Sequence, residues 1–477
     1  MKKNIKRVVA IGIGLSIMNG NIVQAFAAEN NGIKIAQTTV DTTGSTGSND
    51  TNIDKTTVNT NSSVENNNKN IVQTPTDTNS AQIVYTLDNN AKTVSKKPII
   101  TLDKIVNAAI NNSEKVALKS KEIKLYEDKM KLQDKIDDFY TSIDQKVYDF
   151  PNDKLELQKK QTSQSEEFLK DQITTDITNK YNAIILKQMD IEKLNSNFEV
   201  KNKELETMKT KVKIGMATDN QLVDKQIEVE SLKNDITSKE NSLKNNMDFM
   251  GVLTDLKLSN YSFDENIKYN VFKINGSVDA YLDEKIDEYL KYNDEMIKLT
   301  KDYFKDLKDD GIKDIIDKDA PTMPDKTKFA KSDALGNVSF DTGSYAIALM
   351  GYQKDVQNYS NKLTAYGSYL DGKYSLEEGK VKLADSRKNL KNGLKECYST
   401  LLDLQNKINT LNEQVKSTNT KLRYAKSQVD IGMMTENDYK AAVVKSEDLN
   451  TGLRQLINTY NTLKDSIQKP WTLSTNQ

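Results

Sequence analysis

Side chains able to carry out covalent or acid–base chemistry are scarce in this 477-residue chain. It has no histidine and a single cysteine, Cys397. Serine–histidine and cysteine–histidine pairs, histidine-ligated zinc and disulfide bonds are excluded, because each needs a residue that is missing. Cys397 stands beside Tyr398 in a stretch with helical patterning, which favours a buried structural thiol. We therefore expect a protein that is not an enzyme, with no metal site and no cofactor.

The composition favours an elongated helical shape. Hydrophobic residues make up 36% and charged residues 29%, whereas ordinary globular domains are roughly 45–50% apolar. Long helices that bury one stripe and leave the remainder in water fit this balance. The formal net charge is −1, with 68 basic and 69 acidic residues, so no overall field favours nucleic acid. Nucleic acid is not an expected partner.

A short segment that could form a docking surface occurs twice. Val212–Thr218 reads VKIGMAT, and Val429–Thr435 reads VDIGMMT, 217 positions further on. Glycine can adopt the left-handed conformation that ends a helix, and threonine can cap the next helix. Each segment therefore predicts a tight reversal between two helices, and methionines beside a reversal suit docking. The candidate tip residues are Ile214, Gly215, Met216 and Thr218 in the first copy, and Ile431, Gly432, Met433 and Thr435 in the second.

The segments that lead into these tips repeat apolar residues every seven positions. The first half has Ile177, Ile184, Ile191, Phe198, Leu205 and Val212, and positions 217 further on hold Leu394, Leu401, Ile408, Val415, Leu422 and Val429. This match needs no gap, so it indicates an internal repeat. The repeat continues after the first tip through Leu222, Val229, Ile236, Leu243 and Met250, and less cleanly after the second. A strict period of seven predicts helices that coil around their neighbours.

The chain divides by composition into five parts. A positive start, an apolar run and an Ala25-Phe26-Ala27 cleavage pattern predict a signal peptide over residues 1–28. Residues 29–97 are rich in Asn, Thr and Ser and are predicted to be disordered. The first helical repeat is expected over residues 98–276 and the second over 277–470, with a short tail at 471–477.

The predicted fold is mainly all-α, a tandem repeat of long antiparallel coiled-coil hairpins with at most a few short strands. A helix is expected from about Ser113 to Val147, ended by the break around Pro151. The helix entering the first tip is expected to run about 60 residues, or roughly 90 Å. Short strands or a belt are expected between residues 251 and 276. In the second half, a helix is expected from Val278 to Leu307, then mostly loop, with helix resuming near Tyr352.

Duplication, order, length and export together make the chain similar to the TolC-type outer-membrane efflux protein family. Each half of that family opens with a pattern like the Leu102-to-Lys115 stretch and later carries an apolar-Gly-apolar tip, matched here by Ile214-Gly215-Met216 and Ile431-Gly432-Met433. The resemblance covers roughly residues 100–470. It implies a homotrimeric helical tube that docks a periplasmic-adaptor-like protein tip to tip and works with an inner-membrane transporter.

The resemblance also implies acidic residues just past each tip, which line a closed aperture. Asp438 lies six residues past Gly432, and Asp224 lies nine past Gly215, so these two are the candidate aperture acids. The positions that would complete the pattern hold Ala441 and Gln221. For acids this close to a helix start, the alternative role is to complement the helix dipole.

The family's membrane barrel is the larger departure. A membrane-crossing strand needs about 9–11 residues, and the break in the first half is far shorter. The sequence therefore predicts a divergent member with little or no β-barrel, placed in the cell envelope: at the surface or wall, or in an outer membrane if the host has one.

Two further functions stay open beside the exporter or efflux duct. One is a secreted coiled-coil surface or cell-wall protein without transport activity. The other is a helical pore-forming toxin, for which the apolar run Tyr345 to Tyr352 is the best inserting segment and is short.

Overall fold

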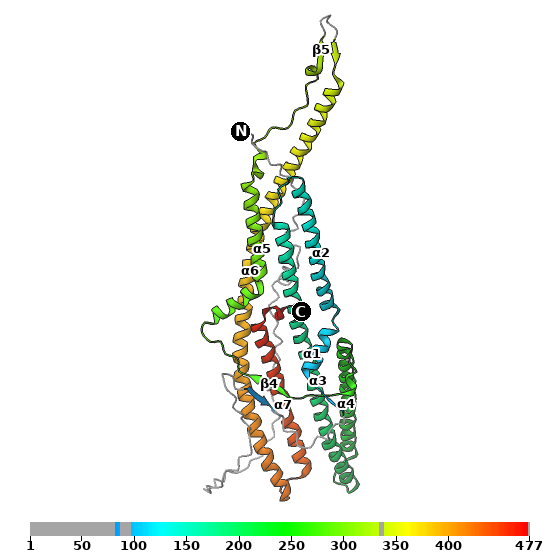
Figure 1. Ribbon diagram of the computed structural model, residues 1–477. Coiled ribbons are helices and arrows are strands. Elements are labelled where there is room, and N and C mark those ends of the chain that lie inside the picture. The colour runs from blue at the N-terminus through cyan, green and yellow to red at the C-terminus, as the bar shows by residue number, and fades with distance from the viewer. Residues whose placement is uncertain (1–81, 86–96, 333–337, 476–477) are drawn as a thin grey trace.

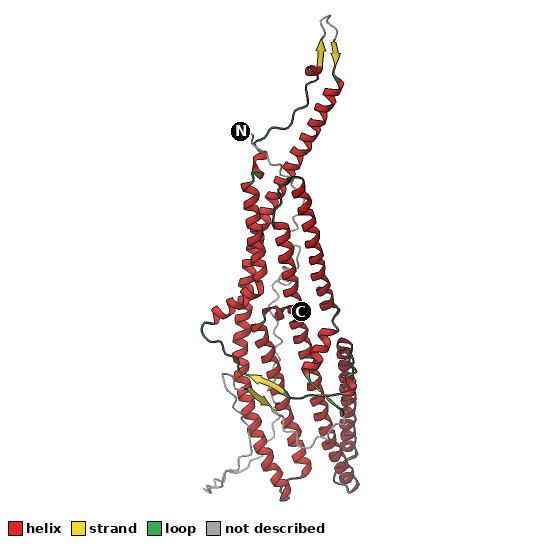
Figure 2. Cartoon of the chain, in the orientation of Figure 1, coloured by secondary structure: helices red, strands yellow, loops and turns green. Residues whose placement is uncertain are grey.

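The computed structural model describes residues 82–85, 97–332 and 338–475 and is dominated by long helices (Figures 1 and 2). The predicted signal peptide, most of the predicted disordered segment and the last two residues lie outside the described part of the chain. The mainly helical fold class is confirmed, with long antiparallel hairpins and a few short strands.

The first half is built on one very long helix. After the two-residue strand β2 (Ile99–Ile100) come α1 (Leu102–Asn111), α2 (Glu114–Ser142), α3 (Phe150–Lys213) and α4 (Asp219–Thr254). Thr101 caps α1 by accepting a hydrogen bond from the Lys104 amide, a position that threonine favours. α3 and α4 run antiparallel and form the first hairpin.

The second half repeats this plan with an even longer helix. α5 (Val278–Asp309) precedes α6 (Thr342–Asp430) and α7 (Glu436–Gln468), and the last two form the second hairpin. The 3₁₀ turns are η1 (Leu258–Asn260), η2 (Ile312–Ile315), η3 (Lys326–Phe329) and η4 (Pro470–Thr475).

The described strands form three two-stranded sheets. β1 (Gln82–Tyr85) pairs antiparallel with β4 (Ile267–Asn270), with Gln82 opposite Asn270. β2 pairs parallel with β3 (Ser262–Phe263). β5 (Ala330–Ser332) and β6 (Val338–Phe340) form an antiparallel pair just before α6. The short strands or belt expected between residues 251 and 276 are therefore β3 and β4, which pair with the earlier strands β2 and β1.

Four boundary predictions are wrong. α2 ends at Ser142 instead of near Val147, and Asp144, just beyond the helix, takes a left-handed φ of 56°. Pro151 does not break the chain but occupies the first turn of α3, where a missing N–H costs nothing. α6 begins at Thr342 instead of near Tyr352, because Asp341 accepts a hydrogen bond from the Ser344 amide and caps it. Residues 82–85, predicted as disordered, form a strand because their Ile-Val-Tyr run suits pairing with β4.

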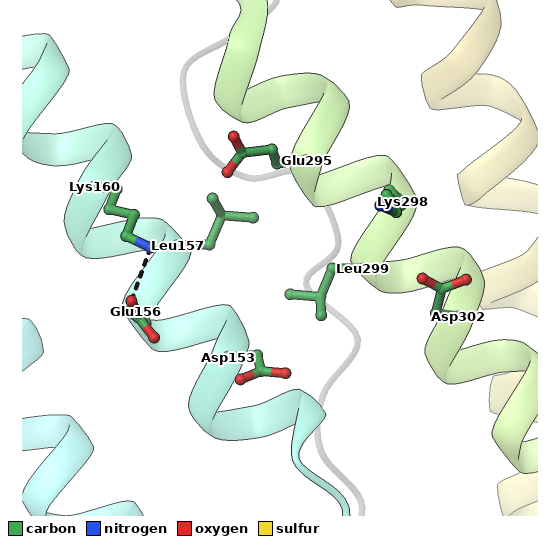
Figure 3. A pocket seen from close by; sticks show the side chains of 8 residues that line it. All are labelled: Asp153, Glu156, Leu157, Lys160, Glu295, Lys298, Leu299 and Asp302. Atoms are coloured by element: carbon green, nitrogen blue, oxygen red, sulfur yellow. Dashed lines mark ion pairs between the residues drawn. The ribbon is translucent and has the colours of Figure 1, made fainter.

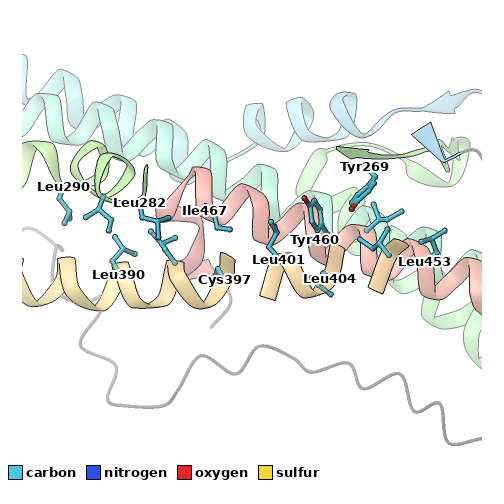
Figure 4. Packing of buried hydrophobic residues seen from close by; sticks show 14 residues of the cluster. Tyr269, Leu282, Leu290, Leu390, Cys397, Leu401, Leu404, Leu453, Tyr460 and Ile467 are labelled. Atoms are coloured by element: carbon cyan, nitrogen blue, oxygen red, sulfur yellow. The ribbon is translucent and has the colours of Figure 1, made fainter. Parts of the chain in front are cut away.

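Each hairpin contains its own apolar core. In the first, Ile177, Ile184 and Met250 from the seven-residue repeat are buried together with the residues of α1. In the second, the repeat residues Leu394, Leu401 and Ile408 pack on α7 and α5, and Figure 4 shows Leu390 facing the leucines of α5. The repeat positions on both sides of both tips are buried or half-buried, so the predicted coiled-coil seams are confirmed. Cys397 belongs to the second core.

The helices lie side by side in a layer that is one helix thick over most of its length (Figure 1). In the half that carries the tips, α3 packs against α4 on one side and α7 on the other, and α6 packs against α7. In the other half, the order across the layer is α2, α3, α5 and α6. The layer therefore has two long edges, one formed by α2 and α4 and the other by α6.

Candidate functional site: hairpin tips and helical edges

Both tips reverse the chain with the same backbone geometry. Gly215 has φ 77° and Gly432 has φ 75°, the left-handed region in which glycine is not strained. The amide of each glycine donates to the carbonyl three residues earlier at 3.0 Å, and the following methionine amide donates five residues back at 2.8 Å. This pair of bonds satisfies carbonyls at the end of each incoming helix. The predicted reversals are confirmed.

The threonines cap the returning helices. Thr218 Oγ1 accepts from the Gln221 amide at 3.4 Å, and Gln221 Oε1 accepts from the Thr218 amide at 3.0 Å. In the second tip, Thr435 Oγ1 accepts from the Asp438 amide at 3.1 Å and donates to Asp438 Oδ2 at 2.6 Å. Asp438 therefore has a structural partner within its own turn. Asp224 lies exposed in the second turn of α4. The two candidate aperture acids therefore belong to different hairpins.

The apolar tip side chains point into solvent. Ile214, Met216, Ile431 and Met433 are 61–76% exposed, and both tips lie at the same end of the molecule (Figure 1). An added Cβ at either glycine would meet nothing within 4 Å. The tips are thus two similar apolar protrusions, each on a turn whose incoming and returning helices are both capped.

The edges of the layer carry a second set of exposed apolar residues, which the sequence reasoning missed. A row on α2 repeats every seven residues and is 50–64% exposed: Leu118, Leu125, Leu132 and Phe139. A row on one face of α6 is 48–74% exposed: Leu370, Tyr374 and Val381. The spacing of the α2 row is readable in the sequence, but its exposure is not, because the same period also marks the buried seams.

These two rows occupy the same stretch of the long axis. Near one end of the stretch, Glu122 of α2 accepts from Thr162, Gln164 donates to the carbonyl of Glu288, and Arg387 of α6 pairs with Asp287. Near the other end, Phe150 stacks on Tyr303, and the adjacent Phe304 contacts Tyr369 of α6. The α2 and α6 rows therefore stand level with one another on opposite edges of the layer.

The joint between the hairpins differs from both hairpin cores, because it is largely polar. Arg454 of α7 is 2% exposed and donates to Asn182 Oδ1 at 2.9 Å and to the carbonyl of Glu265. Burial lowers the pKa of its guanidinium. Lys440 pairs with Glu199 at 3.4 Å and Lys193 with Asp448. Burial, and then Glu192, raise the pKa of Glu447 in the same joint.

A shallow pocket lies between α3 and α5 (Figure 3). Leu157 and Leu299 form its floor, and carboxylates and lysines surround them, with Glu156 and Lys160 paired at 2.8 Å. Burial, and then Asp149, raise the pKa of Asp153. Within the described ranges, no group of three or more His, Cys, Asp or Glu residues is arranged to hold a metal ion. Among these same residues, no helix has a long enough apolar run to span a membrane.

Comparisons with known proteins give likenesses of structure alone. No protein-family model matches the sequence, and no curated protein matches it either. A membrane protein from Pseudomonas aeruginosa aligns at 10% identity and a TM-score of 0.45, over 78% of this chain and 93% of that one. The Campylobacter jejuni CmeC outer membrane channel aligns at 12% identity and 0.45, over 85% and 94%. The Neisseria gonorrhoeae MtrE outer membrane channel aligns at 10% and 0.38, over 78% and 88%. These likenesses assign no role to any residue of this chain.

Proposed function

We propose that this protein is an exporter or efflux duct component of the cell envelope, in which copies close into a helical tube. The observation that carries the proposal is the pair of exposed apolar edges on a layer one helix thick. The α2 row and the α6 row are exposed and stand level with one another in a single chain. Exposed apolar rows of this length are unusual on a monomer and favour an interface.

The two edges differ from each other, so they favour a head-to-tail contact. Such a contact closes into a ring when the rotation between successive copies is a whole fraction of a full turn, without a shift along the axis. The α2 edge of one copy then packs on the α6 edge of the next, and the layer becomes the wall of a tube. The number of copies, three, comes from the TolC-type resemblance, as do the adaptor and the transporter as partners. The tips of all copies then gather at one end, where the exposed Ile-Gly-Met residues suit docking.

The mass of the full mature chain in solution tests this assembly. We expect light scattering at micromolar concentration to give three times the monomer mass. Leu125→Asp with Leu132→Asp should give monomers with unchanged helical circular dichroism, because a charged row cannot be buried against α6. Lys124→Asp is the matched control and should stay trimeric, because Lys124 is exposed and lies about 100° around the same helix from Leu125. A monomeric wild-type protein overturns the tube and favours the secreted surface protein.

A further inference from the structure

The first part of α6 extends past the other helices. Figure 1 shows it continuing beyond the ends of α2 and α5 toward the β5–β6 pair. α5 ends at Asp309, and its Phe304 meets α6 at Tyr369, with 5.7 Å between ring centroids. We call residues 342–366 of α6 the stalk. A helix in water gains most of its stability from burying one face, so the residues along the stalk indicate what covers it.

Two rows of side chains run along one side of the stalk. Tyrosines occur every seven residues at Tyr345, Tyr352, Tyr359 and Tyr366, and aliphatic residues occur every seven at Leu349, Val356, Leu363 and Leu370. Together the rows alternate in steps of four and three, which is the pattern of a coiled-coil seam. This seam was not predicted from the sequence, because its heptads lie outside the 217-residue repeat.

The protein's own chain uses the tyrosine row and leaves the aliphatic row open. Tyr345 lies 5.4 Å from the rings of both Phe329 and Phe340. The Tyr359 hydroxyl donates to the carbonyl of Lys318 at 3.2 Å. By contrast, Val356 and Leu363 of the aliphatic row are 40% and 41% exposed, and Leu349 is half-buried.

The charge around the aliphatic row indicates its occupant. The positions three and four residues from Leu349, Val356 and Leu363 are all uncharged: Tyr345, Ala346, Tyr352, Gln353, Tyr359, Ser360, Tyr366 and Gly367. Charged residues make up 29% of the chain, so this uncharged face is a local exception. An anionic surface or a charged partner would find no opposite charge at these positions. Identical copies that run parallel meet no repulsion between like charges at their flanking positions, and Ser360 and Gly367 allow close approach.

We propose that the stalk binds the stalk of a second copy of this chain, in parallel and in register, along Leu349, Val356 and Leu363. The rows of successive copies then form a bundle at the end opposite the tips. This inference rests on the proposed function in requiring more than one copy per assembly. It adds an interface of its own, separate from the α2–α6 contact that forms the wall.

Disulfide trapping in the full chain tests the stalk contact. Val356→Cys places identical thiols opposite one another in a parallel pair, within the Cα separation that a disulfide spans. Lys354→Cys is the control, since it is exposed and lies on the other side of the same turn. Cys397 should stay unreactive, because it is 2% exposed and burial raises its pKa to about 11.

We expect Val356→Cys to form linked dimers about tenfold faster than Lys354→Cys or more, because positioned thiols act at an effective concentration of millimolar or above. Equal rates in a protein that keeps its trimer mass overturn the stalk contact and leave the tube standing. A monomer mass for both variants and for the wild type overturns the tube and the stalk together. Unchanged circular dichroism confirms that each variant is folded.

Discussion

Arg454 shows how a single residue joins the two hairpins. Its guanidinium is buried at the polar joint, and it donates to Asn182 of α3 and to the backbone of Glu265 in the belt. Asn182 in turn donates to Asn458 of α7 at 2.7 Å. One cation thus connects α7, α3 and the segment between β3 and β4. Because burial disfavours its charge, the arginine stabilises the joint only through the acceptors that it satisfies.

Arg454→Met should lower the free energy of unfolding by about 2 kcal/mol, because it leaves buried acceptors without a donor. Urea unfolding followed by circular dichroism measures the change. Adding Asn182→Leu removes one of those acceptors but also takes away the donor to Asn458. The double variant should therefore be less destabilised than the sum of the two single variants. A double variant as unstable as the sum of the two single variants contradicts this account.

Among the elements, the tips and the coiled-coil seams were predictable, since both depend on local patterns. Glycine in an apolar reversal and threonine as a cap act within one turn, and the seven-residue period describes one helix at a time. The exposed α2 row has the same period as the buried seam of α3, so periodicity alone could not tell which row lacks a partner. That difference depends on the order of the helices across the layer, which involves contacts between residues 100 or more positions apart, such as that between Arg387 and Asp287.

The tips support a prediction at the same scale. Met216→Glu with Met433→Glu changes exposed side chains and leaves the glycines and caps intact, so stability should change by less than about 0.5 kcal/mol. We expect the tagged wild-type protein to retain an adaptor from solubilised host envelopes and the variant to lose it. Met323→Glu, at an exposed methionine away from the tips, is the control and should bind as the wild type does. An adaptor retained equally by all three proteins removes the tips as the docking site.

Across the whole molecule, apolar contacts hold each hairpin together, largely polar contacts join α3 to α7, and ring stacking between Phe150 and Tyr303 joins α3 to α5. The C-terminal turn, predicted only as a tail, adds another apolar contact between the two halves. Trp471 in η4 stacks on Phe168 of α3, with 4.2 Å between ring centroids, and its Nε1 donates to Asp171 Oδ2 at 2.9 Å. Lys469 pairs with the same carboxylate at 2.6 Å. This turn therefore ties the end of the second hairpin to the middle of α3.

Removing the Trp471 ring should separate the unfolding of the two hairpins. Trp471→Ala removes a large buried ring and should cost about 3 kcal/mol. Much of this loss comes from the stacking on Phe168 of α3 between the halves, and the rest from the contact with Tyr289 of α5. Because each hairpin keeps its own core, we expect thermal unfolding followed by circular dichroism to change from one transition to two. Trp471→Phe keeps the stacking and loses only the hydrogen bond to Asp171, so it should retain a single transition. If Trp471→Ala lowers the midpoint and the transition stays single, the hairpins unfold as one unit and the polar joint is stronger than its contacts indicate.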